Sequence, residues 1–476
     1  MEEQRNESNR PVNPRRRKRT KLQIFKEAYL PLIIIALALI LIIVFIAGSI
    51  TRAVQKAKAE KEASIAASSS LAEEEARLKA EAASLLAQAE AMAAGFDYEG
   101  AIAALNSFEG DMKKYPEVYD KLVAYESAFN NTVVWDDPSA IPNLSFQLLI
   151  ADPSRAFSNS SYGYSINKNF ITTEEFSKIL QQLFDNGYIL VDFDDFVTVE
   201  TGADGLPAYK AKSLRLPNGK KPIMLTQTNV NYNYYLVDSD GDKIPDKNGC
   251  GFASKLLWDG SKFICEMVDA SGQTVTGAYD LVPILEDFIE KHPSFSYKGA
   301  RATLALTGYN GLFGHRTHAN AASIFGDEET RAAIQNATTV AEELQNHGYK
   351  LSCYTYENIP YGTSSLTEIK TDMNAWTNEV IPILGDFDIF TFAQLTDITD
   401  EETYAGDKYE TLKSLGFRYY LGFCHDGKPW ATITPDYVRQ GRIMVTGANL
   451  AYHSDWFISL FDPTMVLDTN RGQIPQ

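Results

Sequence analysis

Short apolar runs alternate with amphipathic segments from Ile141 to Val445, and this alternation constrains the fold more than any other feature of the chain. The apolar runs predict strands. The segments between them predict helices, because their apolar residues recur three or four positions apart. Strands that alternate with helices pair in parallel and are covered by those helices. The sequence therefore predicts an α/β fold built on a parallel sheet.

The boundaries of these elements follow from glycines, capping residues and apolar periodicity. A capping box at Thr172 and Glu175 predicts one helix start. The other expected helices are Leu281–Lys291, Glu328–His347, Ser365–Leu384 and Tyr409–Leu415. The expected strands are Ile141–Ile150, Tyr188–Val197, Pro222–Thr226, Ala302–Leu306, Lys350–Cys353, Asp388–Phe392, Tyr419–Phe423 and Arg442–Val445.

The N-terminal region predicts a membrane anchor. Ala28 to Thr51 holds 24 uncharged residues, and a helix of that length spans about 36 Å, enough to cross a bilayer core. A cleaved signal peptide is the alternative, but its apolar core is shorter. Nine Lys and Arg residues precede the segment, which predicts a basic cytoplasmic tail at 1–27 and a single-pass protein with its C-terminal part outside the cell.

Two helical segments follow the predicted anchor. Residues 52–83 are mostly Ala, Glu, Lys and Ser, which predicts a solvated helical stalk because good helix formers with little to bury do not make a coiled-coil seam. Residues 84–130 predict a helical hairpin that resembles one tetratricopeptide-like unit, and one such unit cannot form a solenoid. The large domain is expected at 135–476.

Charge and cysteine usage exclude some classes of function. The net charge of −18 argues against nucleic acid as a partner, because phosphate binding needs clustered Lys and Arg. The four cysteines (Cys250, Cys265, Cys353 and Cys424) form no Cys-x-x-Cys pair, so a thiolate zinc site is not predicted. They are expected to be buried, or paired in disulfides if the domain lies outside the cell.

Three segments carry a resemblance to a known family. They are Lys220–Tyr234 (KKPIMLTQTNVNYNY), His292–Thr317 and Tyr349–Asn358. Together they resemble the polysaccharide deacetylase (NodB homology) family, in its membrane-anchored bacterial branch. The resemblance implies a distorted (β/α) barrel with its site at the C-terminal ends of the strands. It also implies metal-dependent hydrolysis of N-acetylated sugars by a base Asp and by a metal held on another Asp and two His.

The residues at the implied catalytic positions lack that chemistry. The base position falls on Thr228, the metal-binding Asp on Asn229, and the two metal-binding His on Tyr354 and Asn358. A divalent metal of this kind needs imidazole, carboxylate or thiolate ligands, and Thr228 is no base near neutral pH. We therefore expect no catalytic residue at these positions and no retained zinc or other divalent metal site.

Other side chains are candidates for a ligand cleft or for a rebuilt metal site. Aromatic faces stack on sugar rings, so Tyr232, Tyr309 and Tyr356 are expected to line a cleft. His315 and Arg316 join them, because Arg316 matches the family's Gly-Tyr-Arg-Thr segment. A rebuilt metal site would use His315 or His318, although two loop histidines without a nearby carboxylate are more often hydrogen-bonded or solvent-facing.

The segment Val237–Gly251 contains an ion-binding pattern. Asp238, Asp240, Asp242 and Asp246 alternate in a glycine-containing turn that resembles the calcium loops of thrombospondin-type repeats. Carboxylate oxygens at alternating positions suit Ca²⁺. An acidic surface turn without a bound ion is the alternative. Calcium would order the loop and take no part in catalysis.

Three functions are consistent with the sequence. The first is a membrane-anchored, catalytically silent deacetylase-like protein that binds a cell-wall or capsular glycan or a partner enzyme. The second is a working deacetylase or other hydrolase with a rebuilt site. The third is a scaffolding subunit that binds its partner through the stalk and the helical hairpin.

Overall fold

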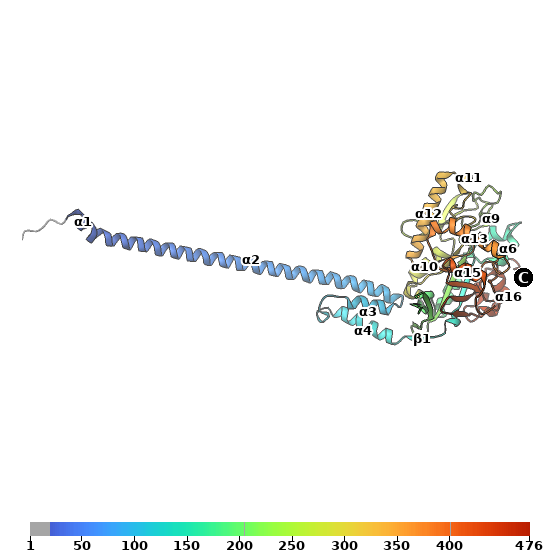
Figure 1. Cartoon of the computed structure of the whole chain (residues 1–476), viewed down its shortest axis with the longest axis horizontal. Coiled ribbons are helices and arrows are strands. Elements are labelled where there is room, and N and C mark those ends of the chain that lie inside the picture. Colours follow the sequence, from blue (N-terminus) through green and yellow to red (C-terminus); the bar gives the residue numbers. More distant parts are fainter. Residues whose placement is uncertain (1–19, 204, 400) are drawn as a thin grey trace, which may run out of the picture. The chain divides into compact units, whose positions relative to one another are not determined.

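The computed structural model describes residues 20–476 apart from 204 and 400. It divides into two compact units, Met1–Ala83 and Ser84–Gln476, which are described separately (Figure 1). Most of the predicted basic tail, residues 1–19, lies outside the described residues.

The first unit is helical. It contains α1 (Lys21–Ile24), a π-helical turn (Phe25–Tyr29) and most of α2 (Leu30–Ala94). The apolar side chains of the predicted anchor segment are exposed around the whole helix: Leu32 is 62% exposed and Phe45 is 75% exposed. By length and composition this helix could cross a membrane, and it is the one such helix among the described residues. Beyond the apolar segment, exposed pairs such as Lys56 with Glu60 support the polar part of α2.

The second unit begins with the last turns of α2, followed by α3 (Tyr98–Asn106), a short 3₁₀ turn (Met112–Lys114) and α4 (Pro116–Asn130). Asp97 caps α3 by accepting a hydrogen bond from the Gly100 amide. The helices contact the rest of the unit at Lys298, whose amide donates to the Gly95 carbonyl at 2.8 Å. Its ammonium group pairs with Glu99 at 2.9 Å.

The centre of the second unit is a closed barrel of seven parallel strands. In pairing order the strands are β7 (Lys221–Thr228), β11 (Thr303–Leu306), β12 (Lys350–Cys353), β13 (Ile389–Thr391), β14 (Tyr419–Phe423), β16 (Val438–Met444) and β2 (Asn143–Phe146). The pairing of β11 with β7 closes the circle. This confirms the parallel strands predicted from the alternating pattern and the (β/α) barrel that the family resemblance implies. β3 (Tyr188–Leu190) pairs in parallel with the first residues of β7.

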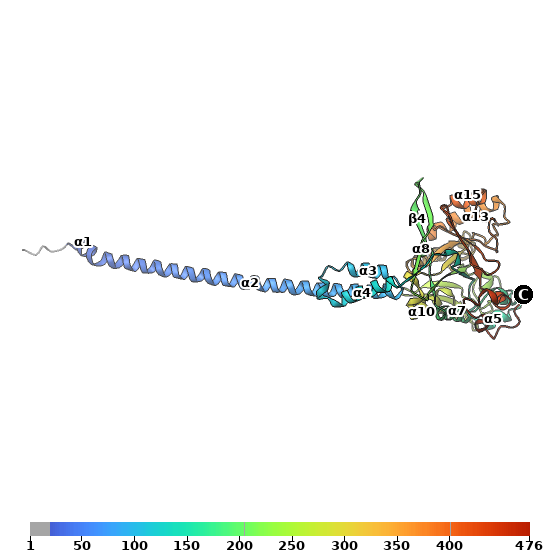
Figure 2. The same ribbon diagram turned by 90° about the horizontal axis from the view of Figure 1, so that it is seen from below.

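Helices surround the barrel, and smaller antiparallel sheets extend it. The helices are α5 (Pro153–Ser158), α6 (Gly163–Asn169), α7 (Thr173–Asp185), α8 (Phe193–Phe196), α9 (Tyr234–Val237), α10 (Leu281–Lys291), α11 (Ala321–Phe325), α12 (Asp327–Asn346), α13 (Leu366–Glu379), α14 (Ile381–Leu384), α15 (Asp407–Ser414), α16 (Gly447–Tyr452) and α17 (Pro463–Val466). The additional strands are β1 (Val133–Trp135) with β6 (Leu214–Leu216), β4 (Val197–Thr201) with β5 (Pro207–Ala211), β8 (Lys255–Trp258) with β9 (Phe263–Val268) and β10 (Thr274–Gly277), and β15 (Ala431–Ile433), which pairs with β16. Figure 2 shows the β4–β5 hairpin projecting from the barrel.

Several predicted elements differ from the structure in their bounds: the strand expected at Ile141–Ile150 is limited to Asn143–Phe146, and the one expected at Arg442–Val445 begins earlier, at Val438. Two other differences have a local cause. The strand expected at Tyr188–Val197 ends at Leu190, because Asp192 and Asp195 form a capping box that starts α8. The helix expected at Ser365–Leu384 is interrupted at Val380, where α13 has ended and α14 begins. Pro382 lies at the start of α14, where its missing amide proton costs least.

The middle of the barrel interior is polar, whereas most of the apolar core lies between the strands and the helices. Asn143, Thr226 and Gln440 form a buried hydrogen-bonded chain, with Thr226 donating to Asn143 at 2.8 Å and Asn143 donating to Gln440 at 3.0 Å. The next interior residue of β16 is Arg442, which is also buried. Interior polar groups of this kind must be satisfied by one another, because solvent does not reach them.

A buried ion pair links the C-terminal segment of the barrel unit to α7. Glu175 on α7 is 0% exposed and accepts hydrogen bonds from Arg471 Nε and Nη2, both at 2.6 Å. Arg471 also donates to the carbonyl oxygens of Asn167 and Phe170. Removal of one member of such a pair leaves the other charge buried without a partner.

We expect the substitution Arg471→Met to lower the free energy of unfolding by about 3–5 kcal/mol, because it leaves the Glu175 carboxylate unpaired. Urea unfolding followed by tryptophan fluorescence measures this, since all five tryptophans lie at position 135 or later. The control is Lys178→Met, which breaks the surface pair with Glu174 on the same helix and should cost about 1 kcal/mol or less. Equal losses in the two variants would contradict this expectation.

Candidate functional site

The carboxyl ends of the seven barrel strands surround one cavity of about 550 Å³, called here the mouth cleft. Residues at or just beyond the ends of these strands line it: Gln147 (β2), Asn229 (β7), Tyr309 (β11), Tyr354 and Asn358 (β12), Gln394 and Leu395 (β13), Phe423, Cys424 and His425 (β14), and Met444 and Thr446 (β16). The rest of the wall is Ser165, Lys168, Asn169 and Phe170, with Asn233 and Tyr235, and Ala448, Asn449 and Trp456. Parallel barrels place their sites at this end.

Neutral polar groups dominate the wall of the mouth cleft. Seven carboxamide side chains line it, together with three tyrosines and the aromatic rings of Phe170, Phe423 and Trp456. Lys168 is its one lysine or arginine, and no Asp or Glu side chain is among the described lining residues. The cleft therefore offers hydrogen-bond donors and acceptors and aromatic faces, but no carboxylate.

Strained backbone positions cluster at the mouth cleft. Asn229, Asn358, Gln394 and Leu395 line it with φ between 54° and 60°, and Thr355 beside Tyr354 has φ 62°. A positive φ is a genuine outlier for a β-branched residue such as Thr355, and each such residue costs about 1–3 kcal/mol. Strain of this kind persists where the surrounding structure imposes it, and it is concentrated at binding and catalytic sites.

Hydrogen bonds hold the strained loop after β12 in place. The buried Asp372 carboxylate on α13 accepts from the amides of Tyr356 at 2.7 Å and Glu357 at 2.8 Å. The Thr355 hydroxyl accepts from the Ile359 amide at 3.0 Å. These contacts fix the loop so that its residues 354 and 358 both face the mouth cleft.

Three of the four positions implied by the family resemblance line the mouth cleft. They are Asn229, Tyr354 and Asn358, while Thr228 lies buried below and donates to the Phe146 carbonyl at 3.3 Å. The buried Oδ1 atoms of Asn229 and Asn358 have no hydrogen-bond partner in the described part of the chain. Buried acceptors of this kind are costly unless a ligand or solvent donates to them.

A buried guanidinium lies next to Tyr354. Arg442 donates from Nε to the Gly422 carbonyl at 3.2 Å, from Nη1 to Ser145 Oγ at 3.1 Å and from Nη2 to the Phe392 carbonyl at 2.8 Å. Burial lowers the pKa of Arg442 to about 10, so it stays charged at neutral pH. Burial raises the pKa of the Tyr354 phenol, and the neighbouring Arg442 charge only partly offsets this, so Tyr354 is neutral.

The structure brings one of the five predicted cleft residues, Tyr309, to the mouth cleft. Tyr232 is buried in the core, where its hydroxyl donates to Asp280 at 2.7 Å. His315 is also buried, with Nε2 3.0 Å from the Leu256 carbonyl oxygen, and burial lowers its pKa to about 4. These two side chains hold loops behind the cleft wall.

Arg316 and Tyr356 also lie outside the described lining of the mouth cleft. Arg316 donates to the Tyr232 carbonyl at 3.0 Å and stacks over the Tyr234 ring, 4.0 Å from its centroid. Tyr356 donates to Glu379 at 2.6 Å. His318, the other histidine considered for a rebuilt metal site, is also outside the described lining, and its ring packs against Tyr234. Desolvation lowers the pKa of His318.

Several lining residues were not predicted. Lys168 and Asn169 come from α6, His425 follows β14, and Trp456 comes from the C-terminal segment. None belongs to a recognisable motif. Only the closure of the barrel brings these distant segments to the same mouth.

Comparison with known proteins adds one similar structure. No family model matches the sequence, and no curated protein matches it. Among solved structures, the chain is similar to a Streptococcus pyogenes deacetylase, PplD, in complex with acetate. The sequence identity is 14%, the match covers 67% of this chain and 95% of that chain, and the TM-score is 0.34.

The mouth cleft does not fit the divalent metal that the family resemblance implies. Its lining offers one imidazole and one thiol, which belong to the adjacent residues His425 and Cys424, and burial raises the pKa of Cys424 to about 12. Divalent metal sites in hydrolases need three or more protein ligands from imidazole, carboxylate or thiolate. The Arg442 charge beside Tyr354 opposes a second cation there.

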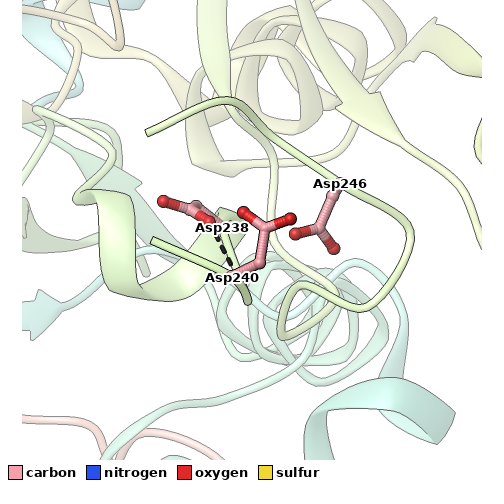
Figure 3. Close-up of side chains that lie close together, drawn as sticks. All are labelled: Asp238, Asp240 and Asp246. Atoms are coloured by element: carbon pink, nitrogen blue, oxygen red, sulfur yellow. Dashed lines mark hydrogen bonds between the residues drawn. The ribbon is translucent and has the colours of Figure 1, made fainter. Parts of the chain in front are cut away.

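Asp238, Asp240 and Asp246 each place one carboxylate oxygen within 4.8 Å of the others, and they form the one group of three or more potential metal ligands among the described residues. Figure 3 shows these three side chains close together. Asp238 Oδ1 accepts from the Asp240 amide at 3.0 Å, and Asp246 Oδ2 accepts from the Ser239 amide at 2.8 Å. Asp242, the fourth predicted ligand, lies outside this group and accepts from the Ile244 amide. Calcium binding by this loop stays a prediction.

Calcium titration of the full-length protein in detergent tests that prediction. We expect Ca²⁺ to raise the midpoint of thermal unfolding and to bind once per chain by calorimetry, and we expect Asp246→Asn to abolish both effects. The matched control is Asp259→Asn, because Asp259 makes similar turn hydrogen bonds, to Ser261 and Lys262, without neighbouring carboxylates. No heat of binding to the unsubstituted protein would contradict the prediction.

Restoring the metal ligands that the family resemblance implies tests whether the Arg442 charge opposes metal binding in the mouth cleft. We expect the quadruple variant Thr228→Asp, Asn229→Asp, Tyr354→His and Asn358→His to take up little zinc, because the Arg442 charge remains below the new site. Adding Arg442→Met should raise zinc uptake about tenfold or more, as measured by equilibrium dialysis and elemental analysis. Full zinc occupancy of the quadruple variant with Arg442 in place would contradict this account.

Proposed function

We propose that this chain is a membrane-anchored, extracytoplasmic protein with a polysaccharide-deacetylase-like barrel that is catalytically silent and binds a cell-wall or capsular glycan. One observation carries the proposal: the mouth cleft at the carboxyl ends of the barrel strands is lined by carboxamides and aromatic rings and by no described carboxylate. Such a lining supports binding of a hydroxyl-rich ligand better than general acid–base or metal-assisted hydrolysis.

The polar groups of the cleft suit sugar hydroxyl and acetamido groups. The unpartnered Oδ1 atoms of Asn229 and Asn358 require donors, which sugar hydroxyls and amide N–H groups supply. The strained backbone at both residues is fixed by the fold, so the cleft loses little conformational entropy when a ligand binds.

Aromatic side chains extend from the cleft to its rim. Tyr309 and Trp456 line the cleft, and Trp456 stacks on His453 with ring centroids 4.4 Å apart. At the rim, Tyr235 is 43% exposed and its ring lies 5.5 Å from that of Tyr162. Exposed aromatic faces beside a polar cleft offer stacking surfaces for further sugar units of a chain.

The anchor and its orientation rest on the N-terminal segment. Its apolar side chains are exposed around the helix and its length suits a bilayer, while the basic residues before it favour an N-terminus in the cytoplasm. This arrangement would present the barrel unit to the cell wall or capsule. A partner enzyme is the alternative ligand of the cleft.

Binding of N-acetylglucosamine tetramers, measured by calorimetry with the full-length protein in detergent, tests the proposal. We expect Tyr309→Ala and Asn358→Ala each to weaken binding about tenfold, because each removes a stacking face or a hydrogen-bonding group from the cleft. Tyr119→Ala is the control, since Tyr119 is an exposed tyrosine on α4 and should leave affinity unchanged. Unchanged affinity in both cleft variants, or no binding to a panel of wall and capsular glycans, would contradict the proposal.

A further inference from the structure

Two arginines of the barrel unit lack the carboxylate partners that two of its buried arginines have. Arg439 pairs with Asp397 at 3.0 Å, and Arg471 pairs with Glu175 at 2.6 Å. In contrast, Arg442 donates to two carbonyl groups and to the Ser145 hydroxyl, and it also interacts with the Tyr354 phenol, so none of these partners is a carboxylate. Arg316 donates only to carbonyl groups. Within the described chain these two guanidinium charges are therefore not neutralised.

Arg442 lies one interior side-chain layer below the floor of the mouth cleft. Successive side chains of a strand point to opposite faces, so Arg442 and Met444 of β16 share the interior face. Met444 lines the cleft. Burial raises the pKa of Tyr354, another lining residue, and the neighbouring Arg442 charge only partly offsets that rise. The charge therefore acts on the cleft through low-dielectric protein instead of water.

No Asp or Glu side chain is among the described lining residues of the cleft, so the lining does not offset the positive charge of Arg442. Lys168 lines the cleft, and its ammonium donates to the Gln476 main-chain oxygen at 2.7 Å. Glu357 precedes Asn358 but is exposed and outside the lining, and Asp426 follows His425 but pairs with Lys428 at 3.1 Å. Lys168 in the described lining and Arg442 below it are therefore the charges on which the cleft's selectivity depends, in a chain whose net charge is −18.

We infer that the mouth cleft selects saccharides by charge, favouring those with a carboxylate or phosphate substituent and rejecting those with protonated amines, and that Arg442 determines this specificity. This inference rests on the proposed glycan binding. A buried, unpaired guanidinium attracts an anionic group without any rearrangement, because the protein holds it in place. A protonated amine meets the same charge and finds no carboxylate in the described lining to bind it.

The test compares matched oligosaccharides on the full-length protein in detergent. The ligands are an N-acetylglucosamine tetramer, its fully de-N-acetylated counterpart, a hyaluronate tetrasaccharide, and a short glycerol-phosphate oligomer. We expect at least one of the two anionic ligands, the hyaluronate tetrasaccharide or the glycerol-phosphate oligomer, to bind about tenfold more tightly than the neutral tetramer. The de-N-acetylated tetramer, which carries protonated amines, should bind about tenfold more weakly than the neutral tetramer. Raising the salt concentration should reduce both differences. Tighter binding of the hyaluronate fragment would assign the charge preference to carboxylates, and tighter binding of the glycerol-phosphate oligomer would assign it to phosphates.

Three substitutions distinguish the effect of the charge from an effect on folding. Arg442→Met should abolish the preference for anions, whereas Arg442→Lys should keep it. Asn229→Asp adds a carboxylate to the cleft at constant volume, at a left-handed position that Asp tolerates, and should remove the preference even if Arg442→Met does not fold. Equal affinity for neutral, anionic and cationic ligands would overturn the charge selection and leave the proposed function standing. Binding of none of them would overturn both.

Discussion

The pairing of β11 with β7 closes the parallel sheet into a barrel, and the rest of the structure depends on that closure. Because all seven strands run in the same direction, closure brings their carboxyl ends to one mouth. It also seals the interior from solvent, so the polar residues inside must bond to one another. Arg442 does this for β2, β14 and the end of β13 through three hydrogen bonds. The same closure that builds the cleft thus places a fixed positive charge beneath it.

That charge lies below the positions to which the family resemblance assigns a metal. The resemblance to polysaccharide deacetylases implies a divalent cation near residues 229, 354 and 358, where this chain has Asn, Tyr and Asn. The lining supplies too few metal ligands, and the guanidinium of Arg442 already provides a cation below Tyr354. An arginine binds an anionic or polar ligand, but it does not activate water as a metal ion does.

Much of the fold was predictable from the sequence because it depends on local patterns. The strands at Lys350–Cys353 and Tyr419–Phe423 and the helix at Leu281–Lys291 agree with the structure in both bounds. Helix α8 was not predicted, because the capping box at Asp192 lies within an otherwise apolar run. The cleft was only partly predictable: Tyr309 lines it, whereas Tyr232 binds Asp280 in the core. Which tyrosine faces the cleft is decided by long-range packing that periodicity does not record.

The most direct test of a silent barrel is the metal content of the purified full-length protein after equilibration with zinc and cobalt, measured together with acetate release from N-acetylated glycans. The account predicts no stoichiometric transition metal and no acetate, since the mouth cleft has no carboxylate among its described lining residues and a buried arginine beneath it. Stoichiometric zinc or cobalt together with released acetate would contradict it, and would show that the barrel is a working hydrolase.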